Sequence, residues 1–241
     1  MNAAHARLWN LLGLGPLWTE RAAATAGRFD AQATPEAAVA PVGRMNWDEL
    51  ERTVTGCTAC GLCKGRTRTV FGVGSRDSEW MVIGEGPGAE EDLRGEPFVG
   101  QAGRLLDSIL AAAGLGRSAS GHAGVYIANV VKCRPPGNRN PEPDEVAHCE
   151  PYLRRQIELL RPRIILLLGR VAAQAMIGTD ASIASLRGRV HRLEIGGSSV
   201  PTIVTYHPAY LLRNLADKAK VWADLCLAHE VFKRSERSPT R

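Results

Sequence analysis

The chain has 241 residues, which is enough for one domain with a hydrophobic core plus an extension. Hydrophobic residues make up 44% and charged residues 23%, as in ordinary globular proteins, and no apolar run reaches the roughly eighteen residues of a membrane span. The formal net charge of +5 favours polyanionic partners, but only weakly, because many basic proteins bind no nucleic acid.

The first 44 residues look different from the rest. Residues 8–18 (LWNLLGLGPLW) loosely imitate a secretory signal, but Asn10, Gly13 and Pro16 interrupt the apolar run. Residues 20–44 are rich in Ala, Thr, Pro and Gly without apolar periodicity, which is typical of a linker. We therefore expect a cytoplasmic protein with an N-terminal extension, a folded domain and a flexible tail at residues 1–44, 45–233 and 234–241.

Apolar runs and amphipathic segments alternate along the remaining chain. The apolar runs predict four buried strands at residues 80–84, 125–131, 163–169 and 202–206. One helix is predicted after Met45 with Asn46 as its cap, and others at residues 102–113, 143–160, 171–177 and 217–232. Residues 189–195, followed by two glycines, predict half of a hairpin before the fourth strand. This order predicts an α/β fold, a single domain with a central four-stranded parallel sheet flanked by helices.

Polar residues follow the predicted strands where each one ends. A Gly-rich turn follows the first strand, Asn129 lies near the end of the second, and His207 follows the fourth. Ligands of open parallel sheets bind beyond the carboxyl ends of the strands. The pattern therefore predicts an active-site crevice at this edge.

Six cysteines are present, and a disulfide framework is not expected in a domain of this size. Cys57 and Cys60 form a C-x-x-C pair, and Cys133 and Cys149 follow later. Four thiolates suit either a [4Fe–4S] cluster or tetrahedral zinc, and spacing does not separate the two. Spacing also leaves Cys63 open as a replacement for Cys60. Cys226, on the last predicted helix, is expected in the core.

The loop at residues 132–139 carries three cations, Lys132, Arg134 and Arg139, and is stiffened by two prolines. Such a loop is a candidate clamp for a DNA backbone. The alternative is an ordinary solvated loop, because charge runs usually face water.

Four segments together resemble the ordered motifs of the iron–sulfur (family 4) uracil-DNA glycosylases. They are CTACGLCKGRTRTVFG, GEGPGAEEDLRGEPFVGQAGRLLD, YIANVVKCRPPGNRNPEPDE and YHPAYLLRN. The resemblance runs from about Trp47 to about Val231 and implies one α/β domain. It also implies a [4Fe–4S] cluster held by Cys57, Cys60, Cys133 and Cys149.

The resemblance implies an enzyme that flips uracil out of single- or double-stranded DNA and hydrolyses its N-glycosidic bond, starting base excision repair. The implied catalytic residues are Glu85 beside the sugar, Asn129 at the Watson–Crick edge and His207 at uracil O2. Phe98 would stack on the flipped base. The remaining implied uracil contacts are Gly86, Pro87, Gly88 and Glu91, the last on the side that excludes a 5-methyl group.

The implied DNA contacts are Arg134, Arg139, Arg213 and an apolar wedge, for which Leu211 and Leu212 are equal candidates. We expect a monomer without membrane contact. Three alternatives remain: a relative that forms a covalent DNA adduct, a non-catalytic iron–sulfur or zinc module, and a glycosylase of broader specificity that includes hypoxanthine or thymine mismatches. The adduct-forming subgroup carries a histidine after the second-strand region, whereas residues 134–143 contain none.

Overall fold

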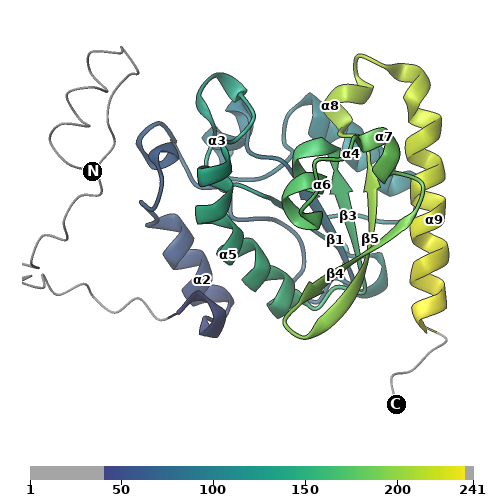
Figure 1. Cartoon of the computed structure of the whole chain (residues 1–241), viewed down its shortest axis with the longest axis horizontal. Helices are drawn as coiled ribbons and strands as arrows, with labels where there is room; N and C mark the ends of the chain where they lie inside the picture. The colour runs from purple at the N-terminus through teal and green to yellow at the C-terminus, as the bar shows by residue number, and fades with distance from the viewer. Residues whose placement is uncertain (1–40, 237–241) are drawn as a thin grey trace, which may run out of the picture. The chain divides into compact units, whose positions relative to one another are not determined.

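The computed structural model describes residues 41–236, and the predictions for residues 1–40 and 237–241 lie outside this range. Figure 1 shows helices packed around a central sheet. The α-helices are α2 (Trp47–Thr55), α3 (Ala89–Arg94), α4 (Gln101–Ala112), α5 (Pro143–Leu160), α6 (Gly169–Ile177), α7 (Ile183–Leu186), α8 (Pro208–Leu211) and α9 (Lys218–Glu236). Short 3-10 turns are η1 (Val42–Arg44), η2 (Gly61–Lys64), η3 (Gly121–Ala123), η4 (Pro136–Asn138) and η5 (Leu215–Asp217).

The sheet contains five strands in the order β2-β1-β3-β5-β4. They are β1 (Trp80–Gly84), β2 (Val125–Asn129), β3 (Ile164–Leu168), β4 (Val190–Ile195) and β5 (Ser198–Thr205). The four predicted strands are present and pair in parallel, which confirms the α/β fold. The predicted strand number of four was too low, because β4 pairs antiparallel with β5 as an edge strand. Gly196 and Gly197 adopt positive φ and close this hairpin, as two-residue turns require.

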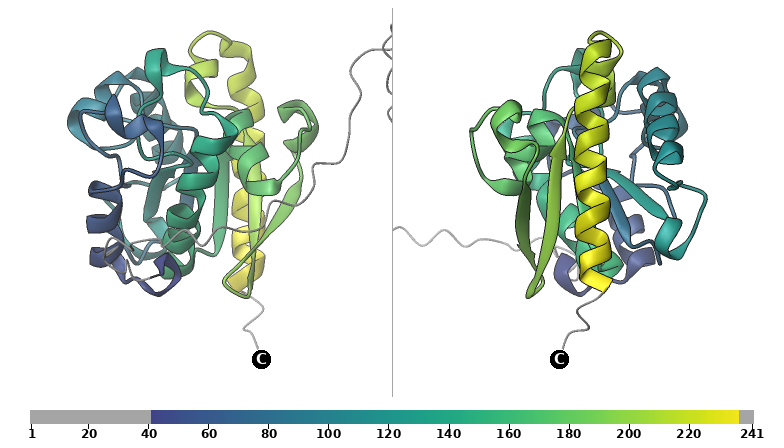
Figure 2. Two further views of the ribbon diagram at one scale, coloured as in Figure 1. Left: turned by 60° about the vertical axis from the view of Figure 1, so that its left-hand side comes forward. Right: turned by 90° about the vertical axis from the view of Figure 1, so that its right-hand side faces the viewer.

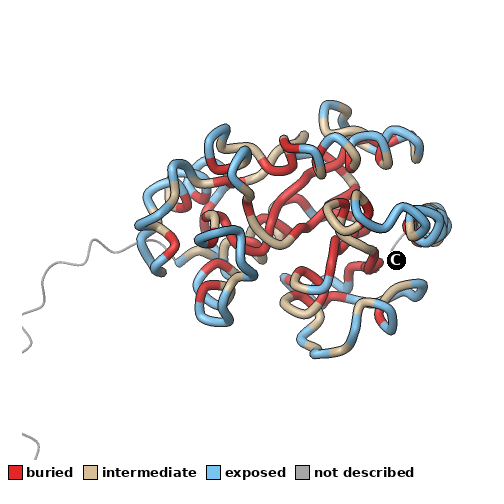
Figure 3. The backbone as a smooth tube through the Cα atoms, turned by 90° about the horizontal axis from the view of Figure 1, so that it is seen from above, coloured by how far each residue is buried: buried red, intermediate tan, exposed pale blue. Residues whose placement is uncertain are grey.

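Successive residues of β1 point to opposite faces of the sheet, as the period of a strand dictates. Met81 and Ile83 pack in the cluster that includes α5 and α6. Trp80 and Val82 pack in the cluster that includes α4 and α9. In Figure 2 (right), α9 runs along one side of the strands, and Figure 3 shows buried backbone in the centre with exposed helices outside. The sheet is therefore covered on both faces.

Helix boundaries follow the predicted signals closely. Asn46 caps α2 by accepting from the backbone N–H groups of Asp48 and Glu49, and Glu49 completes a capping box. The predicted helix at residues 143–160 is observed with the same bounds. Strand β2 ends at Asn129, two residues earlier than predicted, because the chain then turns toward the cysteines. None of the helices within residues 41–236 has the length and apolarity needed to cross a membrane.

Candidate active site and cysteine site

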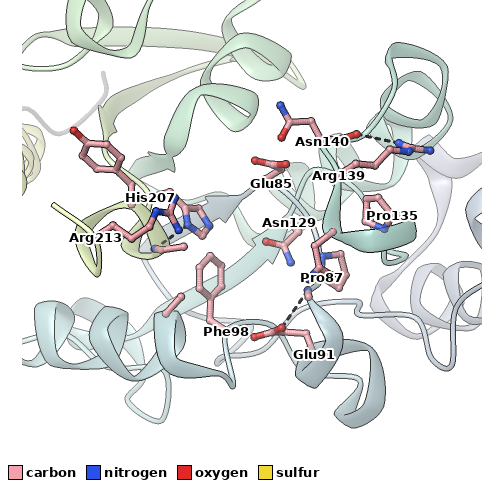
Figure 4. Close-up of a pocket in the computed structure, with 16 residues that line it drawn as sticks. Glu85, Pro87, Glu91, Phe98, Asn129, Pro135, Arg139, Asn140, His207 and Arg213 are labelled. Carbon is pink, nitrogen blue, oxygen red and sulfur yellow. Dashed lines mark hydrogen bonds between the residues drawn. The ribbon is translucent and has the colours of Figure 1, made fainter.

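A pocket of about 410 Å³ opens beyond the carboxyl ends of β1, β2 and β5. This volume lies in the range of small-molecule sites. Figure 4 shows side chains from four separate segments converging on it. The pocket is lined by Glu85, Gly86, Pro87, Gly88, Glu91, Phe98, Ala102, Asn129, Pro135, Asn138, Arg139, Asn140, His207, Ala209, Tyr210 and Arg213. The chain thus brings the predicted catalytic residues and the predicted uracil contacts to one place.

Asn129 is the last residue of β2 and is 1% exposed. Its Nδ2 is buried and has no hydrogen-bond partner among the described residues. A buried donor left unpaired costs about 1–3 kcal/mol, so this amide is set up to bind an acceptor that enters the pocket. Gly84 faces it across the strand pair, and a Cβ built there would lie 2.5 Å from Asn129 Oδ1 and 2.6 Å from Phe98 Cζ. Glycine is therefore required at position 84.

Phe98 adopts a left-handed backbone conformation, with φ of 55°. For a bulky residue this conformation is strained and persists only when neighbours enforce it. The Glu91 carboxylate accepts from the N–H groups of Val99 and Gly100 at 3.0 and 3.1 Å. Arg117 donates to the carbonyls of Pro97 and Phe98 at 2.9 and 3.0 Å. These contacts hold the Phe98 ring at the pocket wall, 5.4 Å from the His207 ring between centroids.

His207 follows β5 and caps α8 through its side chain. Nδ1 accepts a hydrogen bond from the Ala209 N–H at 3.2 Å, so the neutral ring carries its proton on Nε2. Burial lowers the pKa of His207 to about 4, and Glu91 opposes this shift only partly. A neutral imidazole that donates from Nε2 is the result.

Glu85 is half-buried directly after β1. Burial raises the pKa of its carboxyl group, while the positive charge of Arg170 opposes that rise. The carboxyl group therefore titrates above its usual range and lines the pocket on the side opposite Phe98.

The Gly-rich turn is built by close packing. A Cβ at Gly86 would lie 2.8 Å from Val131 Cγ2, so Gly86 lets the turn lie against the second strand segment. Gly88 lines the pocket, and its N–H donates to Glu91 Oε2 at 3.1 Å. Glu91 is thus occupied in bracing the loop.

The basic loop differs from the prediction. Lys132 is 1% exposed and lies in the interior, so it cannot contact DNA. Arg139 makes a bidentate ion pair with Glu145 at 2.7 and 2.8 Å, and Arg134 donates to Asn138 Oδ1 at 2.7 Å. Both arginines lie on a loop at the pocket. They stabilise that loop through these contacts and also give it positive charge.

The leucines after His207 have very different exposures. Leu211 is fully buried in the core with α4 and α9, so the structure contradicts its prediction as a DNA contact. Leu212 is half-buried, Arg213 is exposed at the pocket, and Leu215 is 64% exposed. Leu215 was not a sequence-based candidate, because the short turn η5 in which it lies gives no apolar periodicity.

Five cysteines line a second, smaller pocket: Cys57, Cys60, Cys63, Cys133 and Cys149. All six cysteines of the chain lie within the described residues and are free thiols. Cys226 is exposed on α9, so its prediction as a core residue was wrong. Within residues 41–236, no three His, Cys, Asp or Glu side chains form a ready site for a single metal ion.

Cationic and hydroxyl donors surround the cysteine pocket. Arg66 donates to Cys133 Sγ at 3.2 Å and to the Cys57 carbonyl at 2.7 Å. The Tyr152 hydroxyl donates to Cys57 Sγ at 3.5 Å. Clustered thiolates repel one another, and such donors offset that repulsion. The donor set therefore fits a group bound by several thiolates.

Comparison with known proteins agrees with this geometry. The family model described as "Uracil DNA glycosylase superfamily" matches residues 71–226. The chain is 46% identical to the type-4 uracil-DNA glycosylase of Archaeoglobus fulgidus over 169 residues, which covers 68% of this chain and 82% of that protein. It is 45% identical to the type-4 enzyme of Thermotoga maritima over 172 residues, covering 71% and 85%. A type-5 uracil-DNA glycosylase of Pyrobaculum aerophilum is 34% identical over 149 residues, covering 57% and 64%.

The region that the family model matches contains every residue that lines the pocket at the strand ends, and it contains Cys133 and Cys149 of the cysteine pocket, whereas Cys57, Cys60 and Cys63 precede it. The chain belongs to the uracil-DNA glycosylase superfamily and, within it, to the type-4 enzymes.

Proposed function

We propose that this chain removes uracil from DNA by hydrolysing the bond between uracil N1 and the sugar C1′. The observation that carries the proposal is the Asn129 amide, whose buried Nδ2 has no partner among residues 41–236 and lines the pocket beside Phe98 and His207. The type-4 and type-5 names of its relatives support the same activity.

Recognition rests on Asn129 and Phe98. Inside a duplex the base is inaccessible, so the nucleotide is flipped into the pocket and stacks on Phe98. Asn129 Oδ1 accepts from uracil N3–H, and Nδ2 donates to O4. Cytosine presents an acceptor and a donor in the reverse order, so the fixed amide leaves its polar groups unpaired and rejects it.

Bond cleavage leaves the bonding electrons on uracil and a cationic character on the sugar. His207 donates from Nε2 to uracil O2, where negative charge develops, and remains neutral as it does so. The Glu85 carboxylate, which lines the pocket, stabilises the cationic sugar and orients the water whose oxygen bonds to C1′. Glu85 accepts the proton that this water loses, the C1′–N1 bond breaks with its electrons going to uracil, and the uracil anion becomes free uracil by taking up a proton from solvent, leaving a hydroxyl on C1′ at the abasic site.

The cysteine pocket is proposed to hold a [4Fe–4S] cluster through Cys57, Cys60, Cys133 and Cys149, with Cys63 as a surplus thiol beside it. When bound, the cluster supplies a crosslink between the segment before β1 and the loop after β2. Arg66 and Tyr152 stabilise the thiolates. Iron and acid-labile sulfide analysis distinguishes this cluster from zinc.

DNA binding is proposed for the pocket rim. Arg134, Arg139 and Arg213 supply positive charge for phosphates, and Leu212 and Leu215 are the apolar side chains available to fill the gap left by the flipped base. Leu211 is left out because it has no exposed surface.

The test uses the purified full-length protein and a labelled oligonucleotide containing one uracil, without added metal. Alkali then cleaves any abasic site, and a matched thymine oligonucleotide is the control. We expect cleavage at uracil only. A labelled band that stays attached to protein under denaturing conditions would instead identify an adduct-forming relative, and no cleavage by a cluster-bearing preparation would identify a non-catalytic module.

A further inference from the structure

Lys132 is one of the largest fully buried side chains of the domain, although it lies in a loop rich in charge. A buried lysine is rare unless specific partners hold it. The proposed mechanism assigns it no role, and it does not line the uracil pocket.

The Lys132 side chain reaches back to the residue that reads the base. Its Nζ donates to the backbone carbonyl of Asn129 at 2.9 Å and to Gln156 Oε1 at 2.6 Å. Strand β2 lies at the edge of the sheet, so its last carbonyl depends on partners outside the ladder. Lys132 supplies such a partner in the interior.

Gln156 fixes the other end of this contact. It is 0% exposed, and its Nε2 donates to the Phe71 carbonyl at 2.9 Å and to the Tyr126 hydroxyl at 3.3 Å. The Lys132 ammonium therefore lies between a strand end and a helix side chain that is itself held in place.

The backbone of Lys132 faces the cysteine site. Its neighbour in the chain is Cys133, and Lys132 lines the cysteine pocket together with Cys149. Its carbonyl accepts from the Val70 N–H at 2.8 Å. One residue thus lies beside the proposed cluster ligands and contacts the base-reading residue through its side chain.

We propose that Lys132 is a positioning residue that holds the Asn129 amide in register with the cysteine site, so that cluster binding and uracil recognition share one anchored segment. The inference rests on the proposed role of Asn129 in reading uracil. A strand end without this anchor leaves the Asn129 amide free to shift, and a 1 Å displacement is enough to lose the hydrogen bonds that discriminate the base.

The test compares two variants of the same buried network. Lys132→Met keeps an unbranched side chain that is one atom shorter and removes the N–H donors, whereas Tyr126→Phe removes only the hydroxyl at the far end. Three quantities are measured on each: the single-turnover rate on uracil DNA, the affinity for DNA with a stable abasic-site analogue, and iron content with visible absorbance. Hydrogen exchange of residues 129–131 is followed in parallel.

We expect Lys132→Met to lower the single-turnover rate by about 10-fold or more, the equivalent of about one lost buried hydrogen bond. The affinity for abasic DNA should stay within about 2-fold of the wild-type value, because that ligand has no base for Asn129 to bind. Hydrogen exchange of residues 129–131 should become faster. Tyr126→Phe changes none of these quantities. An unchanged rate in Lys132→Met overturns the inference, and so does an equal loss of rate, abasic-DNA affinity and iron, which indicates a purely structural role.

A double variant separates this inference from the proposed function. In the Asn129→Ala background, Lys132→Met should cause no further loss, because the residue acts through Asn129. Full activity of Asn129→Ala would refute the base-reading role itself. Loss of activity in Asn129→Ala but not in Lys132→Met would refute only the inference.

If the Lys132→Met protein does not accumulate in folded form, Gln156→Met is measured in its place. It removes the second acceptor of Nζ while keeping the lysine. The same pattern, a reduced rate with unchanged affinity for abasic DNA, supports the inference, and an unchanged rate overturns it.

Discussion

The Ala209 backbone N–H donates to Nδ1 of His207, and this single contact determines which nitrogen of the ring can donate to a substrate. Because burial also lowers the pKa of His207 to about 4, the ring is neutral across the physiological range. The imidazole is thereby fixed as a neutral Nε2–H donor before any ligand binds.

This arrangement predicts the pH dependence of activity. His207 stays neutral until about pH 4, so the acidic limb of the single-turnover rate belongs to Glu85, whose pKa is raised by burial. The rate should fall as the pH drops through that raised pKa, because the carboxylate then becomes protonated. Glu85→Gln should lower the rate and flatten the limb. A limb that persists in Glu85→Gln would assign it to another group.

The same histidine affects stability. The pKa of His207 in the folded state lies below its unfolded value, so the unfolded chain takes up a proton first as the pH falls. The contribution of neutral His207 to the free energy of unfolding is therefore complete above about pH 6.5. It should decline between about pH 6.5 and pH 4, by up to roughly 3 kcal/mol. Denaturant melts of wild type and His207→Gln at pH 7.5 and 4.5 test this. Equal declines in both proteins would contradict it.

The close packing around Gly84 predicts that a larger residue at this position lowers activity. A methyl group there would lie within 2.6 Å of both Asn129 Oδ1 and Phe98 Cζ, so Gly84→Ala must displace the two uracil contacts. We expect an activity loss of roughly 100-fold or more, the effect of misplacing groups by about 1 Å. Gly116→Ala is the matched control, because nothing lies within 4 Å of a Cβ at that position. Near-normal activity of Gly84→Ala would show that the pocket adapts.

The hydrogen bonds of Arg117 predict that this residue stabilises the backbone conformation of Phe98. It is 15% exposed and links the Pro97 and Phe98 carbonyls to Asp107. Arg117→Met should lower the free energy of unfolding by about 1–3 kcal/mol and weaken binding to uracil DNA, because the strained Phe98 backbone loses its partners. Arg76→Met removes two exposed ion pairs, with Asp48 and Glu51, and should leave binding intact. Equal binding by both variants would argue against this support.

Buried Leu211 and exposed Leu215 are predicted to give opposite phenotypes when they are replaced by alanine. Leu211→Ala should destabilise the fold by about 2–5 kcal/mol, because the side chain is fully buried. Leu215→Ala should leave stability within about 0.5 kcal/mol yet slow cleavage of duplex more than of single-stranded uracil DNA, since only a duplex leaves a gap in its stack. Equal effects on the two substrates would remove Leu215 as a wedge.

The sequence predicts the parts of this fold that depend on local patterns. Apolar runs indicate the parallel strands, and the Asn46 capping signal places the start of α2. Strand β4 gives a weaker signal because most of its residues are exposed or half-buried. The convergence of Glu85, Asn129 and His207 follows from the common direction of parallel strands, and the observed pocket confirms that these residues converge.

Contacts between distant segments are what the sequence does not reveal. Lys132 is a charged residue type, so the sequence predicts a surface position for it. Its burial depends on a hydrogen bond to Gln156, which lies 24 positions away in the chain. Arg117 contacts a loop about 20 residues earlier in the chain, and no sequence motif indicates this contact. Leu211 and Leu212 are indistinguishable by composition, because helix α8 spans only four residues and gives no readable period.

The most direct measurement is the release of free uracil, separated by chromatography, from a uracil-containing oligonucleotide by the wild type and by Asn129→Ala at equal iron content. Wild type should release one uracil per site and none of the other bases, and Asn129→Ala should be slower by about 100-fold, the loss of roughly two buried hydrogen bonds. Release of uracil at the same rate by Asn129→Ala would contradict the proposed reading of the base. No release by the iron-bearing wild type would contradict the glycosylase activity itself.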